Sequence, residues 1–352
     1  MHPRGKGDWR RPGESCTIRA DAKGTGVRIY PYKFEPIYKE RIWGGRNLER
    51  LFGRVLPQGR RIGESWELAD LEEGVSVVCD GPEAGETLTR LTGGLGGELL
   101  GQAKPQADGR FPLLLKLLDA NDMLSLQVHP DERAAREIGG KAAPKTECWY
   151  VLESRGGSIY KGVKPGVTGE QFLAAIRQDK AADLVRRLDV AAGDFHFLPA
   201  GTVHALGGGV IVAEVQTPSD TTYRLTDWDR GRPVHVEQSM RCIRFDLNGD
   251  KAPGARGDVL VVTEFFTVSR RKAKPQAALP AGRCTAIMIL KGGGRIRHDG
   301  EVERVVPVRA GETVLLPAAL QGAILSAGGA AQGNGSAKDA ECQWLEITLP
   351  ER

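Results

Sequence analysis

Two histidines, a glutamate and a glutamine occupy three short segments that each have the character of a β-strand or a strand end. They are Gln127, His129, Glu147 and His204, in LSLQVHP (124–130), PKTECWY (144–150) and LPAGTVHAL (198–206). Alternate side chains of a strand share one face, so Gln127 and His129 point the same way. Two imidazoles, a carboxylate and a carboxamide that converge from three strands would form a divalent-metal site. These nitrogen and oxygen donors favour zinc, with iron, cobalt or manganese as alternatives.

Single residues of these types are more often structural than functional, so the metal hypothesis depends on all four together. Glu214 stands in a strand rich in valine and isoleucine, where we expect it to be buried and hydrogen-bonded, as a partner of a ligand histidine. We expect His196 to be structural, and we assign no role to His235 or His298. The glycine runs at 207–209 and 292–294 lack the strand–helix context of a phosphate-binding loop.

The elements that would position these residues are mainly short strands. Such strands alternate with Gly, Pro and Asp turns along most of the chain, which predicts a β-sandwich or barrel with helical insertions. A helix over 88–101 is weakened by its glycines, each of which costs about 1 kcal/mol. Asp131 should cap a short helix that ends at Gly139. The clearest helix spans 168–188, where Thr168 and Gln171 form a capping box.

An internal repeat divides the chain. AGDFHFLPAGTVHA (192–205) and AGETVLLPAALQGA (310–323) align at one offset, and 147–159 loosely matches 285–297. Each half therefore has a strand, a glycine turn, a second strand and a Gly-acid strand that ends at proline. This pattern is similar to the two motifs of a cupin, a small jelly-roll barrel. The second copy has Gly322 where the first has His204, so only the first copy can hold the metal.

Length and composition exclude some classes of protein. A chain of 352 residues is long enough for two domains, and no apolar run approaches the ~18–20 residues of a membrane span. The six cysteines are scattered without a CxxC pair, which indicates reduced thiols. The net charge of +4 can be assigned entirely to a basic, disordered leader over 1–30. These features predict a cytoplasmic protein with no nucleic-acid or membrane partner.

Four segments together resemble one enzyme family. LSLQVHPDE, PKTECWYVLE, FLPAGTVHALGGGVIVAE and SDTTYRLTDWDR are similar to the type I mannose-6-phosphate isomerases, in particular to their short bacterial branch. The resemblance implies a mainly β fold of two cupin domains with helical insertions. It also implies a catalytic, metal-binding domain over 31–245, with a helical insertion near 168–188, and a degenerate cupin over 246–352.

The resemblance implies roles for ten residues. One Zn²⁺ per chain would be bound by Gln127, His129, Glu147 and His204. The catalytic residues would be Arg224, Lys145 and Asp220, and the substrate-binding residues would be Ser125, Trp43 and Glu64. One departure concerns proton transfer: many longer relatives have a histidine directly before the pocket lysine, whereas this chain has Pro144. A proton-transfer role for that histidine cannot apply here.

The implied reaction interconverts mannose 6-phosphate and fructose 6-phosphate through a cis-enediolate, whose negative charge a Lewis-acidic metal would stabilise. An ammonium and a planar guanidinium would suit the anionic substrate. The base stays open between a metal-bound water or hydroxide, Asp220 and a ligand histidine. Two other functions are considered: a non-catalytic sugar-phosphate sensor, or another metal-dependent cupin enzyme. We expect a monomer or weak homo-oligomer.

Overall fold

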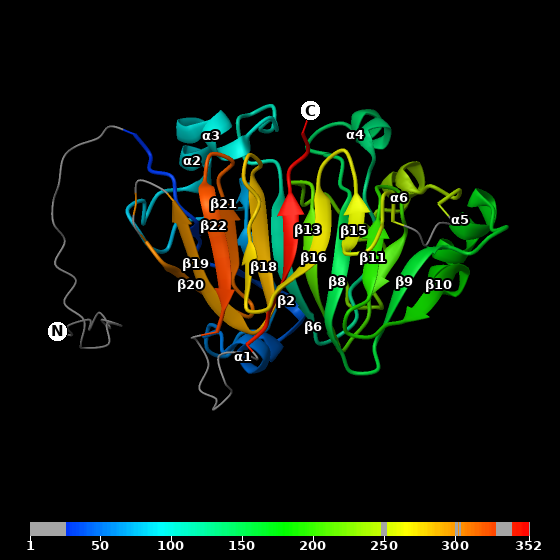
Figure 1. Cartoon of the computed structure of the whole chain (residues 1–352). Helices are drawn as coiled ribbons and strands as arrows, with labels where there is room; N and C mark the ends of the chain where they lie inside the picture. The colour runs from blue at the N-terminus through cyan, green and yellow to red at the C-terminus, as the bar shows by residue number, and fades with distance from the viewer. Residues whose placement is uncertain (1–25, 248–251, 300–301, 303, 329–339, 352) are drawn as a thin grey trace, which may run out of the picture.

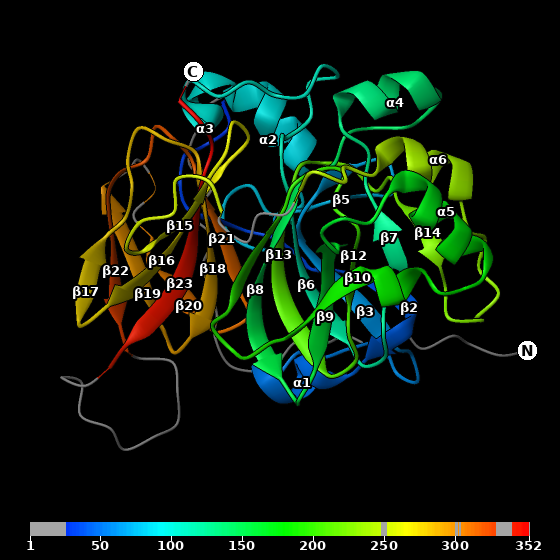
Figure 2. The ribbon, with the colours of Figure 1, turned by 90° about the vertical axis from the view of Figure 1, so that its right-hand side faces the viewer.

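The computed structural model describes residues 26–247, 252–299, 302, 304–328 and 340–351, which fold mostly into antiparallel β-sheets (Figure 1). Viewed at 90° to that orientation, the strands of the C-terminal half lie on the left and those of the N-terminal half on the right (Figure 2). Each half is a sandwich of two sheets. The mainly β, jelly-roll fold that the sequence predicts is therefore confirmed.

The N-terminal sandwich consists of a six-stranded and a five-stranded sheet. In spatial order, the six-stranded sheet contains β11 (Phe195–Leu198), β8 (Glu147–Ser154), β13 (Val210–Gln216), β6 (Leu114–Ala120), β2 (Ile37–Gly45) and β3 (Ile62–Leu68). The five-stranded sheet contains β10 (Val185–Asp189), β9 (Ser158–Val163), β12 (His204–Leu206), β7 (Leu126–Val128) and β14 (Tyr223–Thr226). A small hairpin is formed by β4 (Asp70–Leu71) and β5 (Gly74–Val75).

The C-terminal sandwich repeats this plan with a six-stranded and a four-stranded sheet. The first contains β1 (Tyr32–Lys33), β21 (Thr313–Leu316), β18 (Thr285–Lys291), β23 (Cys342–Thr348), β16 (Thr267–Ala273) and β15 (Val259–Val262). The second contains β17 (Gln276–Ala278), β22 (Gln321–Ala327), β19 (Gly293–Asp299) and β20 (Val306–Arg309). Strand β1, although it comes first in the chain, pairs with β21, so the N-terminal segment fastens the two halves together.

The helices lie around the sheets and are short. They are α1 (Asn47–Phe52), α2 (Leu88–Leu95), α3 (Gly97–Leu100), α4 (Glu132–Ile138), α5 (Gly169–Arg177), the 3₁₀ turn η1 (Ala181–Leu184) and α6 (Val236–Cys242). The predicted cap of α4 is present, since the Asp131 side chain accepts a hydrogen bond from the Ala134 amide, and the helix ends at Gly139. The weak helix over 88–101 is present as two pieces separated by Gly96. Among the described residues, no helix is long and apolar enough to cross a membrane.

The helix predicted over 168–188 is wrong in its second half. Its start is confirmed, because Thr168 and Gln171 form the capping box, but α5 ends at Arg177. Asp179 then takes a φ of 55°, in the left-handed region, which is incompatible with continuing the helix. Of the apolar residues at helical spacing, Phe172 and Ile176 lie in α5, whereas Val185 and Leu188 belong to strand β10. Val185 packs on the helix-covered face of the sheet, and Leu188 packs against the interior of the sandwich.

Alternation within the strands separates the interior of the N-terminal sandwich from the layer of helices. Leu126 and Val128 of β7 pack in a cluster with Phe172 of α5 and Cys242 of α6. The side chain of Gln127, between them in sequence, therefore points to the opposite face, into the sandwich. The face that the sequence predicts for the metal ligands is thus the interior one.

The proposed domain limits stay a prediction. Residues 1–25 of the predicted leader over 1–30 lie outside the described residues. Within the remainder, Tyr30 is fully buried and packs in the core that contains both Leu115 and Leu345. A single core therefore extends from the first described strands into both sandwiches.

Candidate metal centre and active site

Three strands of the N-terminal sandwich bring the four predicted ligands together. Gln127 lies on β7 and pairs with His204, the first residue of the neighbouring strand β12. His129 follows β7 directly. Glu147 is the first residue of β8, which belongs to the opposite sheet. The four side chains thus approach one another from both walls of the sandwich.

The geometry suits a metal ion. Ligand-type atoms of His129, Glu147 and His204 all lie within 4.8 Å of one another. Nε2 of His204 lies 3.1 Å from Oε1 of Glu147, and Nε2 of His129 lies 3.5 Å from Oε2. Nε2 of Gln127 lies 3.2 Å from Nε2 of His204, so the carboxamide joins the same cluster.

The protonation of the two imidazoles tests whether a cation fits. Nδ1 of His129 lies 2.8 Å from the carbonyl oxygen of Thr221, and Nδ1 of His204 lies 2.9 Å from that of Thr202. A carbonyl only accepts, so each Nδ1 carries a proton and each Nε2 is the ring nitrogen that can offer a lone pair to a cation. Nε2 of His129 and both carboxylate oxygens of Glu147 are buried without a well-aligned hydrogen bond among the described residues. Lone pairs that face one another in this way fit a bound cation.

Shifts in pKa keep His129 and Glu147 in the protonation states that a metal ion requires. Burial and the nearby Lys145 outweigh the attraction of Glu147 and lower the pKa of His129 to about 3. Burial alone would raise the pKa of Glu147, but Lys145 and the two histidines hold it well below its usual value. Nζ of Lys145 lies 2.8 Å from Oε2 of Glu147. At neutral pH, His129 is therefore a neutral imidazole and Glu147 a carboxylate.

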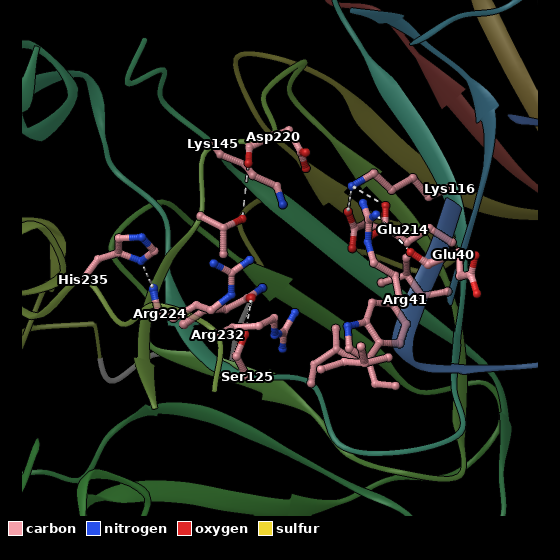
Figure 3. A pocket seen from close by; sticks show the side chains of 17 residues that line it. Glu40, Arg41, Lys116, Ser125, Lys145, Glu214, Asp220, Arg224, Arg232 and His235 are labelled. Atoms are coloured by element: carbon pink, nitrogen blue, oxygen red, sulfur yellow. Dashed lines mark hydrogen bonds and ion pairs between the residues drawn. The ribbon is translucent and has the colours of Figure 1, made fainter. Parts of the chain in front are cut away.

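A cavity of about 590 Å³ opens beside this cluster, with Gln127 in its wall (Figure 3). All six residues that the sequence analysis assigned to catalysis or substrate binding line it, namely Trp43, Glu64, Ser125, Lys145, Asp220 and Arg224. The remaining lining residues are Glu40, Arg41, Ile42, Lys116, Leu118, Leu124, Glu214, Thr222, Arg232 and His235. The volume is within the roughly 300–1,000 Å³ of small-molecule sites.

Arg224 offers a guanidinium to this cavity. It lies on β14 opposite Gln127 of β7, and among the described residues its buried Nε has no hydrogen-bond partner. Burial, followed by repulsion from Arg232, lowers the pKa of Arg224. Arg232 itself forms hydrogen bonds with the carboxylate of Asp227, whereas Arg224 has no ion pair within the described residues. Arg224 is thus a cation arranged to receive an anion.

The sequence analysis missed a buried network in the opposite wall. Nζ of Lys116 on β6 lies 3.3 Å from Glu214 on β13 and 3.8 Å from Glu64 on β3. Arg41 donates to Glu64 over 2.7 Å, and so does the indole N–H of Trp66. The signal was present as a single lysine within the apolar run FPLLLKLLDA (111–120). A charge there must be buried, and buried charges require partners.

Two further expectations need correction. Glu214 is buried and hydrogen-bonded as expected, but it accepts from the indole N–H of Trp149 at 3.0 Å and has no bond to a ligand histidine. Its link to the cluster is indirect, because the rings of Trp149 and His204 pack against each other in a T-shaped arrangement. His235, to which the sequence gave no role, lines the cavity, and its Nδ1 accepts the backbone N–H of Arg224 at 3.2 Å. The local sequence around His235 contains no signal for this contact.

Comparisons with known proteins agree with this arrangement. Residues 32–164 match the family model described as phosphomannose isomerase type I, catalytic domain. The chain is 34% identical over 304 residues to the mannose-6-phosphate isomerase ManA of Bacillus subtilis (strain 168), covering 82% of this chain and 93% of that protein. It is 36% identical over 290 residues to the probable mannose-6-phosphate isomerase GmuF of the same organism, covering 77% and 89%.

A solved structure shows the same relationship in three dimensions. The crystal structure of the mannose 6-phosphate isomerase from Bacillus subtilis superimposes with a TM-score of 0.76 at 28% identity, covering 90% of this chain and 99% of that one. The similarity therefore extends through both sandwiches and includes the strands that carry the cluster. On these grounds, the chain belongs to the family of type I phosphomannose isomerases.

Proposed function

We propose that this protein interconverts D-mannose 6-phosphate and D-fructose 6-phosphate, with one zinc ion bound by Gln127, His129, Glu147 and His204. The observation that carries the proposal is the pairing of the His129–Glu147–His204 cluster with a cavity that contains an unpaired guanidinium. The proposed substrate is the one for which the relatives are named, mannose 6-phosphate. The cluster and cavity support it, because they combine a metal site with cations suited to a phosphate.

The four ligands would hold the metal with a single negative charge. Gln127 and two metal-bound imidazoles would be neutral donors, and Glu147 would contribute the one carboxylate. When bound, zinc would supply Lewis-acid stabilisation of negative charge on the sugar oxygens. The carbonyl groups of Thr221 and Thr202 orient the two rings for this role, as supporting hydrogen bonds do at protein metal sites.

The cations of the cavity would hold and polarise the substrate. Arg224 presents paired donors in a fixed fork, which matches phosphate or the two oxygens of a cis-enediolate. Lys145 adds a point charge close to Glu147. The hydroxyl of Ser125 donates to Oε1 of Gln127 at 3.2 Å, so its first role is to orient that side chain.

Proton transfer between C1 and C2 requires a base. The ring nitrogens of His129 and His204 are committed, since Nδ1 donates to a carbonyl and Nε2 faces the metal position. Of the carboxylates in the cavity wall, Glu40, Glu64 and Glu214 take part in ion pairs. Asp220 lines the cavity and has no ion-pair partner within 4.0 Å among the described residues. We assign the proton transfer to Asp220.

A coupled isomerase assay with metal analysis tests this function. The purified enzyme should contain about one zinc per chain, lose activity on chelation and regain it when zinc is added. Binding of mannose 6-phosphate without turnover, in zinc-replete protein, would contradict the enzyme and support a sugar-phosphate sensor. Full activity after complete removal of metal would contradict the metal assignment alone.

Replacement of one ligand gives a sharper test. His204→Ala removes one of the two nitrogen donors, so zinc content and turnover should fall together to background. His298→Ala, which removes an imidazole in the C-terminal sandwich, is the matched control and should keep both. Stoichiometric zinc in the His204→Ala protein would remove His204 from the ligand set.

A further inference from the structure

The two sandwiches share one strand order. The sequence β11-β8-β13-β6 of the N-terminal half corresponds to β21-β18-β23-β16 of the C-terminal half. On the facing sheets, β10-β9-β12-β7 corresponds to β20-β19-β22-β17. Every strand that carries the candidate active site, apart from β2, β3 and β14, therefore has a counterpart in the second half.

The strand registers extend this correspondence to single residues. Glu147 pairs with Leu198 on one side and Gln216 on the other, and Thr285 pairs with Leu316 and Thr348 in the same way. Thr285 thus takes the position of Glu147. Gly322 takes the position of His204, and the β17–β22 register, continued by two residues, places Pro280 where Gln127 stands. None of these residues is a metal ligand.

The same registers place a second cavity where the first half has its active site. A cavity of about 380 Å³ is lined by Arg271, Lys272, Ala277, Ala278, Leu279, Pro280, Trp344 and Glu346. Residues 277–280 correspond to 124–127, and Glu346 corresponds to Glu214. Arg271 corresponds to Leu118, which lines the active-site cavity. The metal ligands have been replaced, but the cavity and one of its carboxylates remain.

The polar groups of this second cavity are arranged to bind a ligand. Nε of Arg271 donates to Oε1 of Glu346 at 3.1 Å, and among the described residues its two terminal Nη groups donate to no partner. The Glu346 side chain is only 10% exposed, so the pair holds the guanidinium in place. Trp344 is 1% exposed, and its indole N–H has no acceptor within the described part of the chain. The Arg271 side chain is 41% exposed, whereas the unpartnered indole N–H of Trp344 is buried, and both offer hydrogen bonds to an acceptor-rich ligand in this cavity.

The surrounding charge indicates the kind of ligand. Arg271 and Lys272 line the cavity and Glu346 is its one acidic lining residue, so the lining carries a net positive charge. A carboxylate beside a guanidinium fork can accept from sugar hydroxyls while the fork donates to an anionic group. We propose that the C-terminal sandwich holds a second, metal-free binding site for an anionic monosaccharide, a sugar that carries a phosphate or a carboxylate. Without counterparts of Glu147 and His204, the site binds but does not isomerise.

Calorimetric titration of the zinc-loaded, full-length enzyme tests the proposal. The probe is 6-phosphogluconate, an anionic sugar acid that has no carbonyl to isomerise. The wild-type protein should bind two equivalents per chain. Arg271→Leu should weaken one of the two sites by about 10–100-fold, the loss expected when a charge-assisted hydrogen bond is removed, and should keep kcat/KM for the isomerase reaction. Arg224→Leu should weaken the other site.

Controls separate a local effect from a general one. Arg297→Leu removes an exposed cation from β19, on the opposite sheet, and should leave both sites intact. If Arg271→Leu lowers the melting temperature more than Arg297→Leu does, Arg271→Lys is used in place of Arg271→Leu. Loss of the second binding site in Arg271→Lys would then support the proposal. Galacturonate should bind the second site, whereas neutral mannose should bind at least tenfold more weakly. A single equivalent in the wild type, two unaltered sites in both Arg271 variants, or inorganic phosphate binding as tightly as the sugar acid would overturn the proposal.

Discussion

Glu147 is a buried carboxylate at the centre of the candidate metal site. It is 1% exposed, and removing a carboxylate from water costs several kcal/mol unless partners compensate. Lys145 provides one partner at 2.8 Å, and Nε2 of each histidine lies within 3.5 Å of a Glu147 oxygen. The protein therefore supplies one cation beside Glu147, and a bound metal would supply a second.

Arg224 should act through its geometry as well as its charge. Arg224→Lys preserves the cation but replaces a fixed fork with one mobile point charge. We expect zinc content to be retained and turnover to fall by about 10²–10³, the usual loss of one preorganised donor in a transition state. Steady-state kinetics separate two roles: a fall in kcat indicates contact with the enediolate, and a rise in KM alone indicates contact with phosphate. Arg136→Lys, on the exposed face of α4, is the control; wild-type kinetics in both variants would exclude Arg224 from the site.

Glu64 should make the stability of the enzyme depend on pH. Burial alone would raise the pKa of Glu64, but Lys116, Arg41 and the Trp66 hydrogen bond outweigh burial and lower it to about 2 from 4.5. A carboxyl whose pKa is depressed by folding stabilises the native state above its unfolded pKa, and this contribution is lost as the pH falls from 4.5 towards 2. The full contribution is on the order of 3 kcal/mol at 1.36 kcal/mol per unit.

Urea unfolding at a series of pH values measures this contribution. Glu64→Gln should lower the free energy of unfolding near pH 6, where the wild type keeps its ion pairs with Arg41 and Lys116. The difference between the two proteins should shrink as the pH falls below 4.5. If the free energies of unfolding of the two proteins fall in parallel between pH 4.5 and pH 2, Glu64 is not the group that makes stability depend on pH.

At the scale of residues, the sequence predicted the four residues of the candidate metal site. It missed residues whose role depends on contacts between neighbouring strands. The cluster residues stand in short segments with a recognisable pattern, and the fold brings them together. Lys116, Glu64 and Glu214 are separated by up to 150 positions, and they meet because β3, β6 and β13 are neighbours in one sheet. Without strand order, neither the Lys116 network nor the contact between His235 and Arg224 could be predicted.

At the scale of elements, local signals fixed the starts of helices better than their ends. Capping by Thr168 and Asp131 depends on residues three positions apart, so the sequence contains the whole interaction. The end of α5 depends instead on the pairing of β10 with β9, where Val185 and Leu188 contribute to two different apolar layers. Apolar spacing alone does not distinguish these two uses.

The turn before β12 should be sensitive to substitution. Gly201 has a φ of 88°, and its N–H donates to the carbonyl of His129 at 2.9 Å. A methyl group there would lie 2.9 Å from the carbonyl oxygen of Cys242, so Ala would displace the turn as well as strain it. Gly201→Ala should therefore weaken zinc affinity by about 10–100-fold, because Thr202, which orients His204, follows directly.

A second glycine provides a control that has backbone strain on substitution but no steric clash. Gly156 also has a positive φ, 71°, but nothing lies within 4 Å of an added Cβ. Gly156→Ala should cost only about 1–2 kcal/mol of stability and leave the metal in place. Equal zinc affinity in the two variants, measured by competition with a chelator, would show that the Gly201 turn does not position the ligands.

At the scale of the whole molecule, the two sandwiches are joined by one apolar core. Leu115, Leu117 and Ala213 face it from the N-terminal sheet, and Leu345 and Ile347 face it from the C-terminal sheet. The internal repeat predicted the existence of the second sandwich, since both copies have their strands at corresponding positions. It could not predict that β1 pairs across the halves with β21, because Tyr32 and Lys33 form a strand too short to have its own pattern.

A shared core predicts cooperative unfolding. Ile347 is 1% exposed and lies in this core, so Ile347→Ala should cost about 2–5 kcal/mol, although it is far along the chain from every metal ligand. Because both sheets lose packing together, scanning calorimetry should show one transition, shifted down as a unit. The temperature at which isomerase activity disappears should fall by the same amount.

Ile324→Ala, on a side chain 39% exposed on β22, is the control and should leave both temperatures nearly unchanged. The contrary result would be two calorimetric transitions in Ile347→Ala, of which only one shifts, with activity lost at the wild-type temperature. That result would mean that the two sandwiches unfold independently and that the N-terminal half does not depend on the C-terminal half for its stability.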